Sequence, residues 1–315
     1  MTHPPRTLVI VGAGFSGTAV AINLLRLSYW KPVRIVLVER AEHMARGAAY
    51  ADKGYPYLLN VPAGRMSLNS GDPLDFLKFA RQRKPAATAD DFLPRSLYGE
   101  YLEEALRTAE LASPPHVQLT RIRGDVCSVE RVGNKRSLRV ELKDGSSFIA
   151  DDVVLALGNP PPAHLRGTEQ LRNSARYVAD PWSSPPKFEQ GETALIIGTG
   201  LSMADAVIAG NEATFHAISR RGLVPPSQTA FRQAGCDDDG DKLIRAAALS
   251  ARRLLRAVRE LTDEVQSRGG DWREAITCVR NLAPAIWQRL SQQERQRFLR
   301  HARPYWDVHR YRLPQ

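Results

Sequence analysis

The sequence predicts an α/β protein in which two strand–turn–helix–strand units are followed by a helical segment. Three observations predict this fold class: the run LVIVGAGFSG at residues 8–17, a second apolar run with a glycine turn, ALIIGTGLSMAD, at residues 194–205, and apolar residues spaced by three and four beyond residue 240. Short apolar runs are typical of buried parallel strands, and such strands need crossover helices. Strands that alternate with helices therefore indicate an α/β fold.

The first glycine turn has the spacing of a dinucleotide-binding turn. Residues 8–11 form the predicted strand, and we expect the helix after the turn to run to about Leu27. Gly12 permits the tight turn, Gly14 lets the backbone approach a pyrophosphate, and Gly17 lets helix and strand pack closely. The helix N-terminus offers N–H groups to the anion. The candidate residues of this turn are Gly12, Gly14, Phe15, Ser16 and Gly17.

An acidic residue follows at the place where such a fold binds ribose. Residues 33–38 form a second predicted strand, which ends at Glu39 and is followed by Arg40. A carboxylate at this position can accept both hydroxyls of an adenosine ribose. A glycine-rich turn beside an ordinary surface glutamate is the alternative, but strand, turn, helix, strand and acid in register favour the ribose role. Both Glu39 and Arg40 are candidate binding residues.

Composition and cysteine spacing argue against several classes of protein. The 315 residues are 43% hydrophobic and 25% charged, which is ordinary for a globular protein. No run reaches the roughly 18 apolar residues of a membrane span, and no signal peptide is expected, so we predict a cytoplasmic protein. Cys127, Cys236 and Cys278 are too far apart for a disulfide reductase pair or a zinc knuckle. We expect each to be a small buried hydrophobe and predict no metal site.

Most of the net charge of +10 belongs to the last quarter of the chain. Residues 241–315 contain 16 Lys and Arg but only 8 Asp and Glu. A basic surface could meet nucleic acid or anionic lipid. Here acidic residues are interspersed and the arginines alternate with apolar residues at helical spacing, which favours a solvated helix face. We therefore expect neither a nucleic-acid nor a membrane partner.

The rest of the first 160 residues divides into a loop, two helices and a group of strands. The long segment after Glu39 is rich in glycine, alanine and proline, and loops of this length are usually functional. Asp72 is a predicted N-cap for a helix over residues 74–82, with Asp75 in its first turn. A second helix is expected from Ser96. Alternation of period two over residues 117–150 predicts an antiparallel meander with turns at 133–135 and 144–146, and residues 152–157 return as a buried strand.

The second glycine turn carries a different signal at its distal end. Gly198 and Gly200 take the first two glycine positions, and the next strand, residues 213–219, ends in Ser219, Arg220 and Arg221. Two guanidinium groups where an acid would hold a 2′-hydroxyl suit a 2′-phosphate, which predicts NADPH rather than NADH. The alternative is that these arginines belong only to the basic surface.

The chain becomes helical beyond residue 237. Apolar residues between 254 and 265 repeat at helical spacing, and Asp271 with Glu274 and Ser291 with Glu294 are predicted capping boxes. The tail RHARPYWDVHRYRLPQ combines aromatic side chains with arginines. It is either a substrate or nucleic-acid surface or a helix end whose aromatic side chains are anchored on the body.

These segments resemble a bacterial family of FAD/NAD(P)-binding proteins, similar in plan to flavin-dependent N-hydroxylating monooxygenases and to FAD-dependent urate hydroxylases. The resemblance covers essentially the whole chain. It implies FAD on Gly12, Gly14, Gly17 and Glu39, and NADPH on Gly198, Gly200, Ser202, Arg220 and Arg221. The segments that carry it are VIVGAGFSGTAVAINLL, LLNVPAGRMS, DDVVLALGNPPP, VADPW, IIGTGLSMAD, ISRRGLVP and RPYWDVHR.

The resemblance also implies further contacts and a division into domains. Asn60, Val61, Pro62, Arg65 and Met66 are expected near the flavin, Asp125 and Val126 near the adenosine, and Gly158 and Asn159 where the two nucleotide domains join. We expect an FAD-binding Rossmann-like domain at 1–160, an NADP-binding one at 161–236, and a helical segment with a basic tail at 237–315.

Two features depart from the family pattern. The connection between Asp205 and the strand at residue 213 is short, which predicts a stubby helix. Family members continue well past the WDVHR segment and return to complete the FAD domain, whereas this sequence ends at Gln315. From this we expect a fragment, a truncated homologue or a form without turnover.

The sequence thus predicts an FAD-dependent, NADPH-reduced oxidoreductase, specifically a flavin monooxygenase that uses O₂ to hydroxylate a small nitrogenous or aromatic substrate. An NADPH-dependent flavin reductase without oxygenation and a nucleotide-binding sensor without turnover are the alternatives. No Ser-His-Asp, metal or paired-carboxylate pattern competes, and no catalytic residue is assigned. The oligomeric state is not predicted.

Overall fold

The computed structural model describes residues 5–27, 31–54, 57–133, 137–183, 185–210, 212–227 and 237–310, the side chains of 237–239 excepted. The chain forms two compact units, residues 1–187 and 188–315, and each is described by itself. The finer division into three domains stays a prediction.

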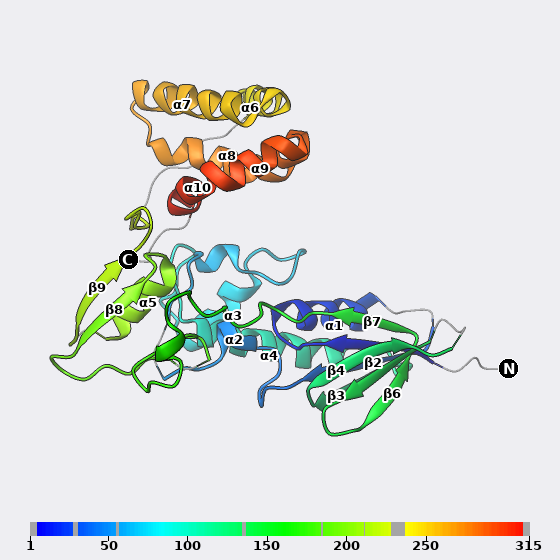
Figure 1. The fold of residues 1–315 in the computed structure, drawn as a ribbon. Coiled ribbons are helices and arrows are strands. Elements are labelled where there is room, and N and C mark those ends of the chain that lie inside the picture. Colours follow the sequence, from blue (N-terminus) through cyan, green and yellow to red (C-terminus); the bar gives the residue numbers. More distant parts are fainter. Residues whose placement is uncertain are drawn as a thin grey trace. The chain divides into compact units, whose positions relative to one another are not determined.

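A four-stranded parallel sheet is the centre of the first unit (Figure 1). Its strands follow the order β3-β2-β1-β7, with β1 (Arg6–Val11), β2 (Val33–Glu39), β3 (Val117–Arg123) and β7 (Asp152–Leu155). The crossover helix after β1 is α1 (Phe15–Leu27), as predicted. The chain reverses its direction of winding at β1, between β2 and β7. In open α/β sheets, ligands bind beyond the carboxyl ends of the strands at such a point.

Alternating side chains of the central strands β1 and β2 are buried on both faces of this sheet, whereas Leu155 of β7, predicted to lie in a buried strand, is 62% exposed. Ile10, Ile35 and Leu37 are fully buried against α1 and α4 (Arg95–Leu111). Val36 and Val38 point to the opposite face, where they pack with the meander of β4 (Val126–Arg131), β5 (Leu138–Leu142) and β6 (Ser147–Ala150). Helices thus cover one face and a small antiparallel sheet covers the other.

The prediction that residues 117–123 belong to the meander is wrong. These residues form β3, which pairs in parallel with β2. The chain turns at Gly124, whose N–H donates to the Glu39 carbonyl at 2.9 Å and where a Cβ would lie 2.2 Å from Leu142 Cδ2. The meander itself is confirmed for β4, β5 and β6, and its second turn is closed by the Ser146 N–H on Asp144. Of the first predicted turn, 133–135, only Gly133 lies within the described residues.

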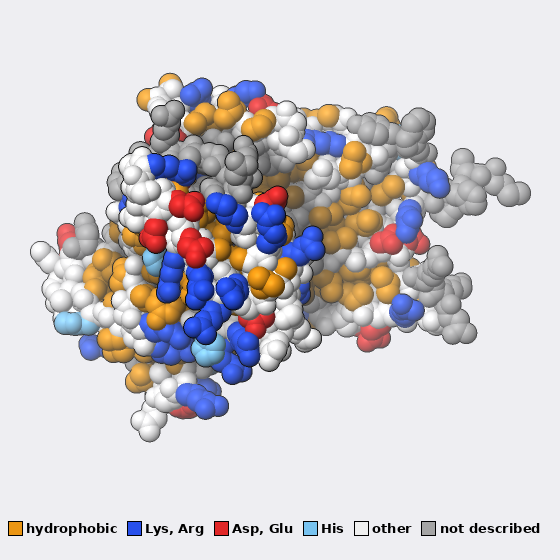
Figure 2. Space-filling view, turned by 90° about the horizontal axis from the view of Figure 1, so that it is seen from above, with side chains coloured by type: hydrophobic (Ala, Val, Ile, Leu, Met, Phe, Trp, Pro, Cys, Tyr) orange, Lys and Arg blue, Asp and Glu red, His pale blue; other side chains and the backbone are white. Residues whose placement is uncertain are grey.

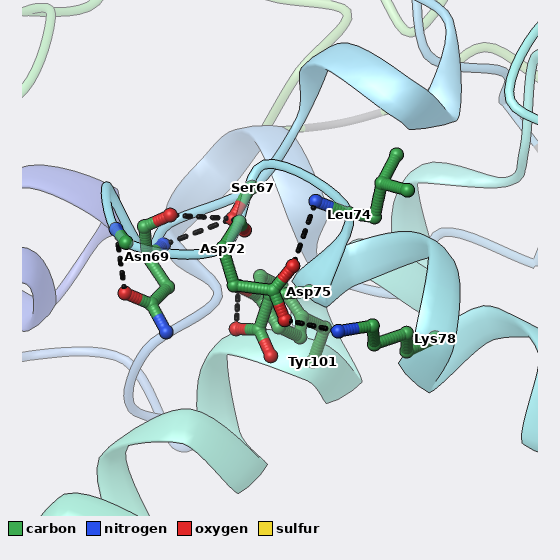
Figure 3. Close-up of polar contacts among 8 residues, drawn as sticks. Ser67, Asn69, Asp72, Leu74, Asp75, Lys78 and Tyr101 are labelled. Carbon is green, nitrogen blue, oxygen red and sulfur yellow. Dashed lines mark hydrogen bonds and ion pairs between the residues drawn. The ribbon is translucent and has the colours of Figure 1, made fainter.

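Short helices occupy the long segment between β2 and β3: α2 (Gly47–Tyr50), the 3₁₀ turn η1 (Ala63–Arg65) and α3 (Asp75–Arg83), which precede α4. The predicted N-cap at Asp72 is wrong, because α3 begins at Asp75. The Asp72 carboxylate accepts from the Leu74 N–H at 3.2 Å and pairs with Lys78 at 2.5 Å, before the helix begins (Figure 3). Asp75 accepts the Tyr101 hydroxyl instead, which ties α3 to α4. A second 3₁₀ turn, η2 (Glu169–Leu171), lies near the end of this unit.

The second unit contains a two-stranded parallel sheet and a group of helices. β8 (Thr193–Ile197) and β9 (Thr214–Ile218) are joined through α5 (Leu201–Ala209), the short helix that the sequence predicts. The helices α6 (Asp237–Leu249), α7 (Ala251–Ser267), α8 (Trp272–Arg289), α9 (Gln292–His301) and α10 (Arg303–Arg310) follow. Leu243, Ala247, Leu261 and Val265 form the centre of their core. In the described ranges, no helix combines the length and apolar character needed to cross a bilayer.

One of the two predicted capping boxes is complete. Asp271 and Glu274 exchange both side chain to backbone bonds at the start of α8. Ser291 caps α9 by accepting from the Glu294 N–H. The Glu294 carboxylate, however, accepts from the Ala251 N–H at 2.8 Å. The predicted return bond from the Ser291 N–H to Glu294 is therefore wrong. Glu294 therefore joins the start of α9 to the start of α7.

The cysteine prediction is right for one residue and wrong for another. Cys278 is buried in the core of the helical segment, whereas Cys127 is exposed on β4. Cys236 lies outside the described residues.

Candidate dinucleotide-binding sites

Two glycines of the first turn are required by the fold itself. Gly12 has φ +96°, and a Cβ there would lie 2.3 Å from the Ala156 carbonyl oxygen at the end of β7. A Cβ on Gly17 would lie 1.9 Å from the Gly12 carbonyl oxygen. Only glycine fits at both positions, because a side chain would push α1 away from the sheet.

Gly14 is different, because packing within the protein does not require it. Among the described residues, a Cβ built there meets only the Gly47 Cα, at the ordinary contact distance of 3.6 Å. The space lies at the N-terminus of α1, where Phe15 and Ser16 are exposed. The Thr18 N–H makes the bond to the Gly14 carbonyl, so the amides just before it belong to the helix start, where N–H groups face outward. This cradle fits a pyrophosphate.

The fold fixes the Glu39 carboxylate at the end of β2. Oε2 accepts from the Ala13 N–H at 2.8 Å and Oε1 from the Ala41 N–H at 3.0 Å. The sequence did not reveal these two anchors, because they depend on the path of the turn. Each carboxylate oxygen can accept a second bond, so Glu39 can still accept ribose hydroxyls.

The segment expected near the adenosine lies beside the backbone of Glu39. The Gly124 N–H donates to the Glu39 carbonyl, and Asp125 and Val126 follow directly. Lys143 lies 2.7 Å from the Asp125 carboxylate and, through this hydrogen bond, holds the pKa of that carboxyl below its usual range. Arg40 is exposed, and its positive charge lowers the pKa of Asp125 further, by less than Lys143 does.

The loop expected near the flavin is anchored by backbone bonds. The amides of Ala63 and Gly64 donate to the carbonyls of Asp91 and Ala89 at 2.9 and 2.8 Å. Met66 packs against the aromatic core around Tyr98, and the Phe15 ring stacks on Tyr98 at 6.3 Å. Loop and helix start therefore contact one common core. The remaining predicted residues of this group lie as follows: Val61 and Pro62 are half-buried, and Asn60 and Arg65 are exposed.

Gly158 and Asn159 follow β7 and are both exposed. Gly158 has φ +68°, which favours glycine at this bend. Their expected place at the junction of two nucleotide domains stays a prediction.

The second glycine turn has the same relation to its strands. Gly198 has φ +117°, and its N–H donates to the Ile218 carbonyl of β9 at 2.8 Å. A Cβ at Gly200 would meet no atom of the residues that the structure describes within 4 Å. Thr199 Oγ1 lies 2.9 Å from Ser219 Oγ and 2.6 Å from the Leu223 carbonyl, so the turn is tied to the segment after β9. This segment carries the two arginines.

A pocket of about 220 Å³ opens between this turn and α10. It brings together four predicted residues, Gly200, Ser219, Arg220 and Arg221, whereas Ser202 is exposed on α5. The residues that sequence reasoning missed are Thr199, Leu201, Leu223, Pro225, Pro304, Asp307 and Val308. The last three lie on α10, and no spacing rule connects that tail with a turn a hundred residues earlier.

The tail contains both a packed and an exposed aromatic side chain. Trp306 packs against the helical core, as an anchored helix end should. Tyr305 is 51% exposed, and its ring lies 5.9 Å from the guanidinium carbon of Arg221. Asp307 is paired with Arg303 at 3.3 Å and with Arg310 at 3.8 Å.

Charges of both signs mix on the face that carries the helical segment (Figure 2). Lys and Arg side chains gather there with Asp and Glu side chains among them. Such mixing is expected of solvated helix faces.

Residues 9–160 match the FAD-NAD(P)-binding family model. This match confirms the predicted resemblance at the level of an FAD-NAD(P)-binding segment. The segment includes the first glycine turn, Glu39, the loop at residues 60–66 and Asn159. The second glycine turn lies outside it, so that site depends on its own geometry.

No curated protein matches the chain. Solved structures similar to it include cyclohexanone monooxygenase from Rhodococcus sp. Phi1 bound to NADP⁺, with 17% identity over 78% of this chain and 45% of that chain (TM-score 0.40). A flavin monooxygenase from Stenotrophomonas maltophilia has 20% identity over 78% and 64% (TM-score 0.44). OTEMO in complex with FAD and NADP has 14% identity over 79% and 46% (TM-score 0.48). The chain spans about half the length of the first and third.

Proposed function

We propose that the protein is an FAD-dependent oxidoreductase whose FAD is reduced by NADPH. The observation that supports this is the pair of glycine turns in one chain, each at the carboxyl end of parallel strands but with opposite charges beyond it. The first is followed by the carboxylate of Glu39, and the second by the guanidinium groups of Arg220 and Arg221. Opposite charges at equivalent positions suit two different dinucleotides.

The first unit would hold FAD. The backbone around Gly14 would bind the pyrophosphate at the N-terminus of α1, and Glu39 would accept the ribose hydroxyls. The chemistry that bound FAD would supply is to accept a hydride and to pass electrons on to a second substrate. The chain's own residues bind and orient the cofactor, and the buried sheet behind the turn keeps the glycine backbone in place.

The second unit would hold NADPH through its 2′-phosphate. Arg220 and Arg221 line the pocket, and charge-assisted hydrogen bonds from guanidinium to phosphate are about twice as strong as neutral ones. The Gly222 N–H donates to Ser219 Oγ at 3.0 Å, which fixes the turn that presents both arginines.

Within this class we propose a monooxygenase that uses O₂ and a small nitrogenous or aromatic substrate. The sequence resemblance to flavin-dependent hydroxylases supports this proposal. No residue is assigned as a general acid or base, and a cytoplasmic location also stays a prediction.

Purified protein tests the proposal in two steps. Ligand released by denaturation and identified by mass should be FAD, and the protein should oxidise NADPH with uptake of O₂. An oxygenated product formed in step with NADPH supports a monooxygenase. NADPH oxidation without such a product indicates the reductase, and dinucleotide binding without any NADPH oxidation indicates the sensor. Failure to bind either dinucleotide contradicts the proposal.

A further inference from the structure

Helix α10 forms a wall of the second pocket that no spacing in the sequence indicates. Pro304, Asp307 and Val308 line the pocket from this helix, together with Arg220 and Arg221 from the turn after β9. The ring of Tyr305 lies next to Arg221, and a cation over an aromatic face is attracted to it. Arg221 is therefore held on the α10 side of the pocket.

The lining of this wall differs chemically from the part that would hold phosphate. Leu223 and Pro225 after β9 join Pro304 and Val308 as apolar surfaces. Asp307 supplies a carboxylate, which only accepts hydrogen bonds when ionised and repels phosphate. A flat apolar group with an N–H donor on one edge would satisfy such a lining.

We propose that α10 forms the adenine subsite of the second dinucleotide site, with Asp307 accepting a hydrogen bond from the exocyclic amino group of adenine. Leu223, Pro225, Pro304 and Val308 contact the ring. The inference rests on the proposed NADPH site and names the residues that select its base.

Size and charge both support this assignment. Pockets for complete small ligands hold about 300–1,000 Å³, and about 220 Å³ here suits the nucleoside end of a dinucleotide rather than the whole molecule. Ion pairs with Arg303 and Arg310 hold the Asp307 carboxylate in position and offset part of its charge. A purine with a carbonyl in place of the amino group would present an acceptor to Asp307, and two acceptors repel each other.

The test compares adenine with hypoxanthine on the full chain. Binding of NADPH, of its hypoxanthine analogue and of NADH is measured by titration calorimetry for the wild type, Asp307→Asn and Asp263→Asn. The wild type should prefer adenine by about tenfold or more, because a hydrogen bond to a charged group is replaced by repulsion. Asp307→Asn should reduce this preference to about threefold or less, because an amide can donate to the carbonyl as well as accept from the amino group. Asp263, exposed on α7, is the matched control and should leave the preference unchanged.

Val308→Ala provides a second variant that keeps Asp307. It should weaken the binding of NADPH and of its hypoxanthine analogue by a similar factor and leave the ratio of the two affinities unchanged, because it removes only apolar contact.

The outcomes separate this inference from the proposed function. Equal affinity of the wild type for both bases, or an unchanged preference in Asp307→Asn, overturns the adenine subsite while the NADPH site stands. A change confined to the ratio of NADPH to NADH in Asp307→Asn also overturns it, and assigns Asp307 to the ribose instead. If the wild type binds neither NADPH nor NADH, the proposed function fails as well.

Discussion

At the scale of single residues, the glycines of the first turn serve two purposes. Gly12 and Gly17 leave no room for a Cβ, so the sheet and α1 require them. Gly14 has room for one, which agrees with its proposed role in the approach of a pyrophosphate. Sequence spacing identified all three glycines but could not separate these purposes, because the separation depends on how close the surrounding backbone lies.

Gly14→Ala should therefore weaken FAD binding without weakening the fold. We expect the free energy of unfolding to change by no more than about 0.5 kcal/mol, while affinity for FAD and for ADP falls at least about tenfold because the new methyl group occupies the pyrophosphate position. Urea unfolding and fluorescence titration measure the two effects.

Gly12→Ala is the matched control for this prediction. It should destabilise the first unit by about 1–3 kcal/mol or more through its positive φ and the contact with Ala156. Equal loss of stability in the two variants would contradict the distinction between them.

Glu39→Ala should lower FAD affinity about ten- to a hundredfold, because hydrogen bonds to a charged group contribute about 1.5–3 kcal/mol each. The same change also removes the acceptor for the amides of Ala13 and Ala41. Glu39→Gln keeps one oxygen acceptor and should show a smaller loss. FMN lacks the adenosine, so equal affinity of the wild type for FMN and FAD would contradict the ribose role of Glu39.

At the scale of elements, the contact between α3 and α4 predicts a dependence of stability on alkaline pH. The Tyr101 hydroxyl donates to Asp75 at 2.7 Å (Figure 3). It also accepts from the Leu68 N–H at 3.0 Å. Burial, together with the bond to Asp75, raises the pKa of Tyr101 to about 12. The folded protein thus keeps a proton that the unfolded chain releases near pH 10, so this stabilisation is lost as the pH rises from about 10 to about 12.

Tyr101→Phe should reduce this loss. Its free energy of unfolding should decline less steeply between pH 10 and 12, by up to about 1.4 kcal/mol per pH unit. Phe79→Leu, a neighbour without a titrating group, should lower stability by the same amount across this range. Parallel pH profiles of Tyr101→Phe and wild type would show that the Tyr101 proton is not involved.

The bond between Glu294 and the start of α7 predicts a second effect of this kind. Glu294→Ala should destabilise the second unit by about 1.5–3 kcal/mol, because the Ala251 N–H loses a charged acceptor. Glu264→Ala is the control: Glu264 pairs with Lys242 at 3.8 Å, both side chains are more than half exposed, and such pairs contribute about 0–1 kcal/mol. If thermal unfolding showed a similar loss of stability for Glu294→Ala and Glu264→Ala, the role of the Glu294 bond would be contradicted.

Elements were predictable where the signal was local. The strands β1 and β2, helix α4 and the complete capping box of α8 follow from apolar periodicity and a three-residue spacing. Residues 117–123 alternate like a meander strand, and only their pairing with β2 shows that β3 belongs to the parallel sheet. The Glu294 carboxylate had a competing donor from a distant helix, which no local pattern contains.

At the scale of the whole molecule, both glycine turns could be predicted from the sequence, but only one side of the second pocket could. Gly200, Arg220 and Arg221 follow from the strand–turn–helix spacing. Asp307 and Val308 come from a helix that lies about a hundred residues later, and their part in the pocket depends on tertiary packing alone.

We propose that the chain uses NADPH to reduce its own FAD. The most direct measurement is the loss of the visible absorbance of oxidised flavin when FAD-loaded protein is mixed with NADPH or NADH without oxygen. We expect full reduction of the FAD, at least about tenfold faster with NADPH than with NADH at equal subsaturating concentrations. The Arg220→Ala/Arg221→Ala double variant should lose this preference, because each lost phosphate contact costs about 1.5–3 kcal/mol. Bound FAD that neither nucleotide reduces, or a preference for NADPH that survives in the double variant, would contradict it.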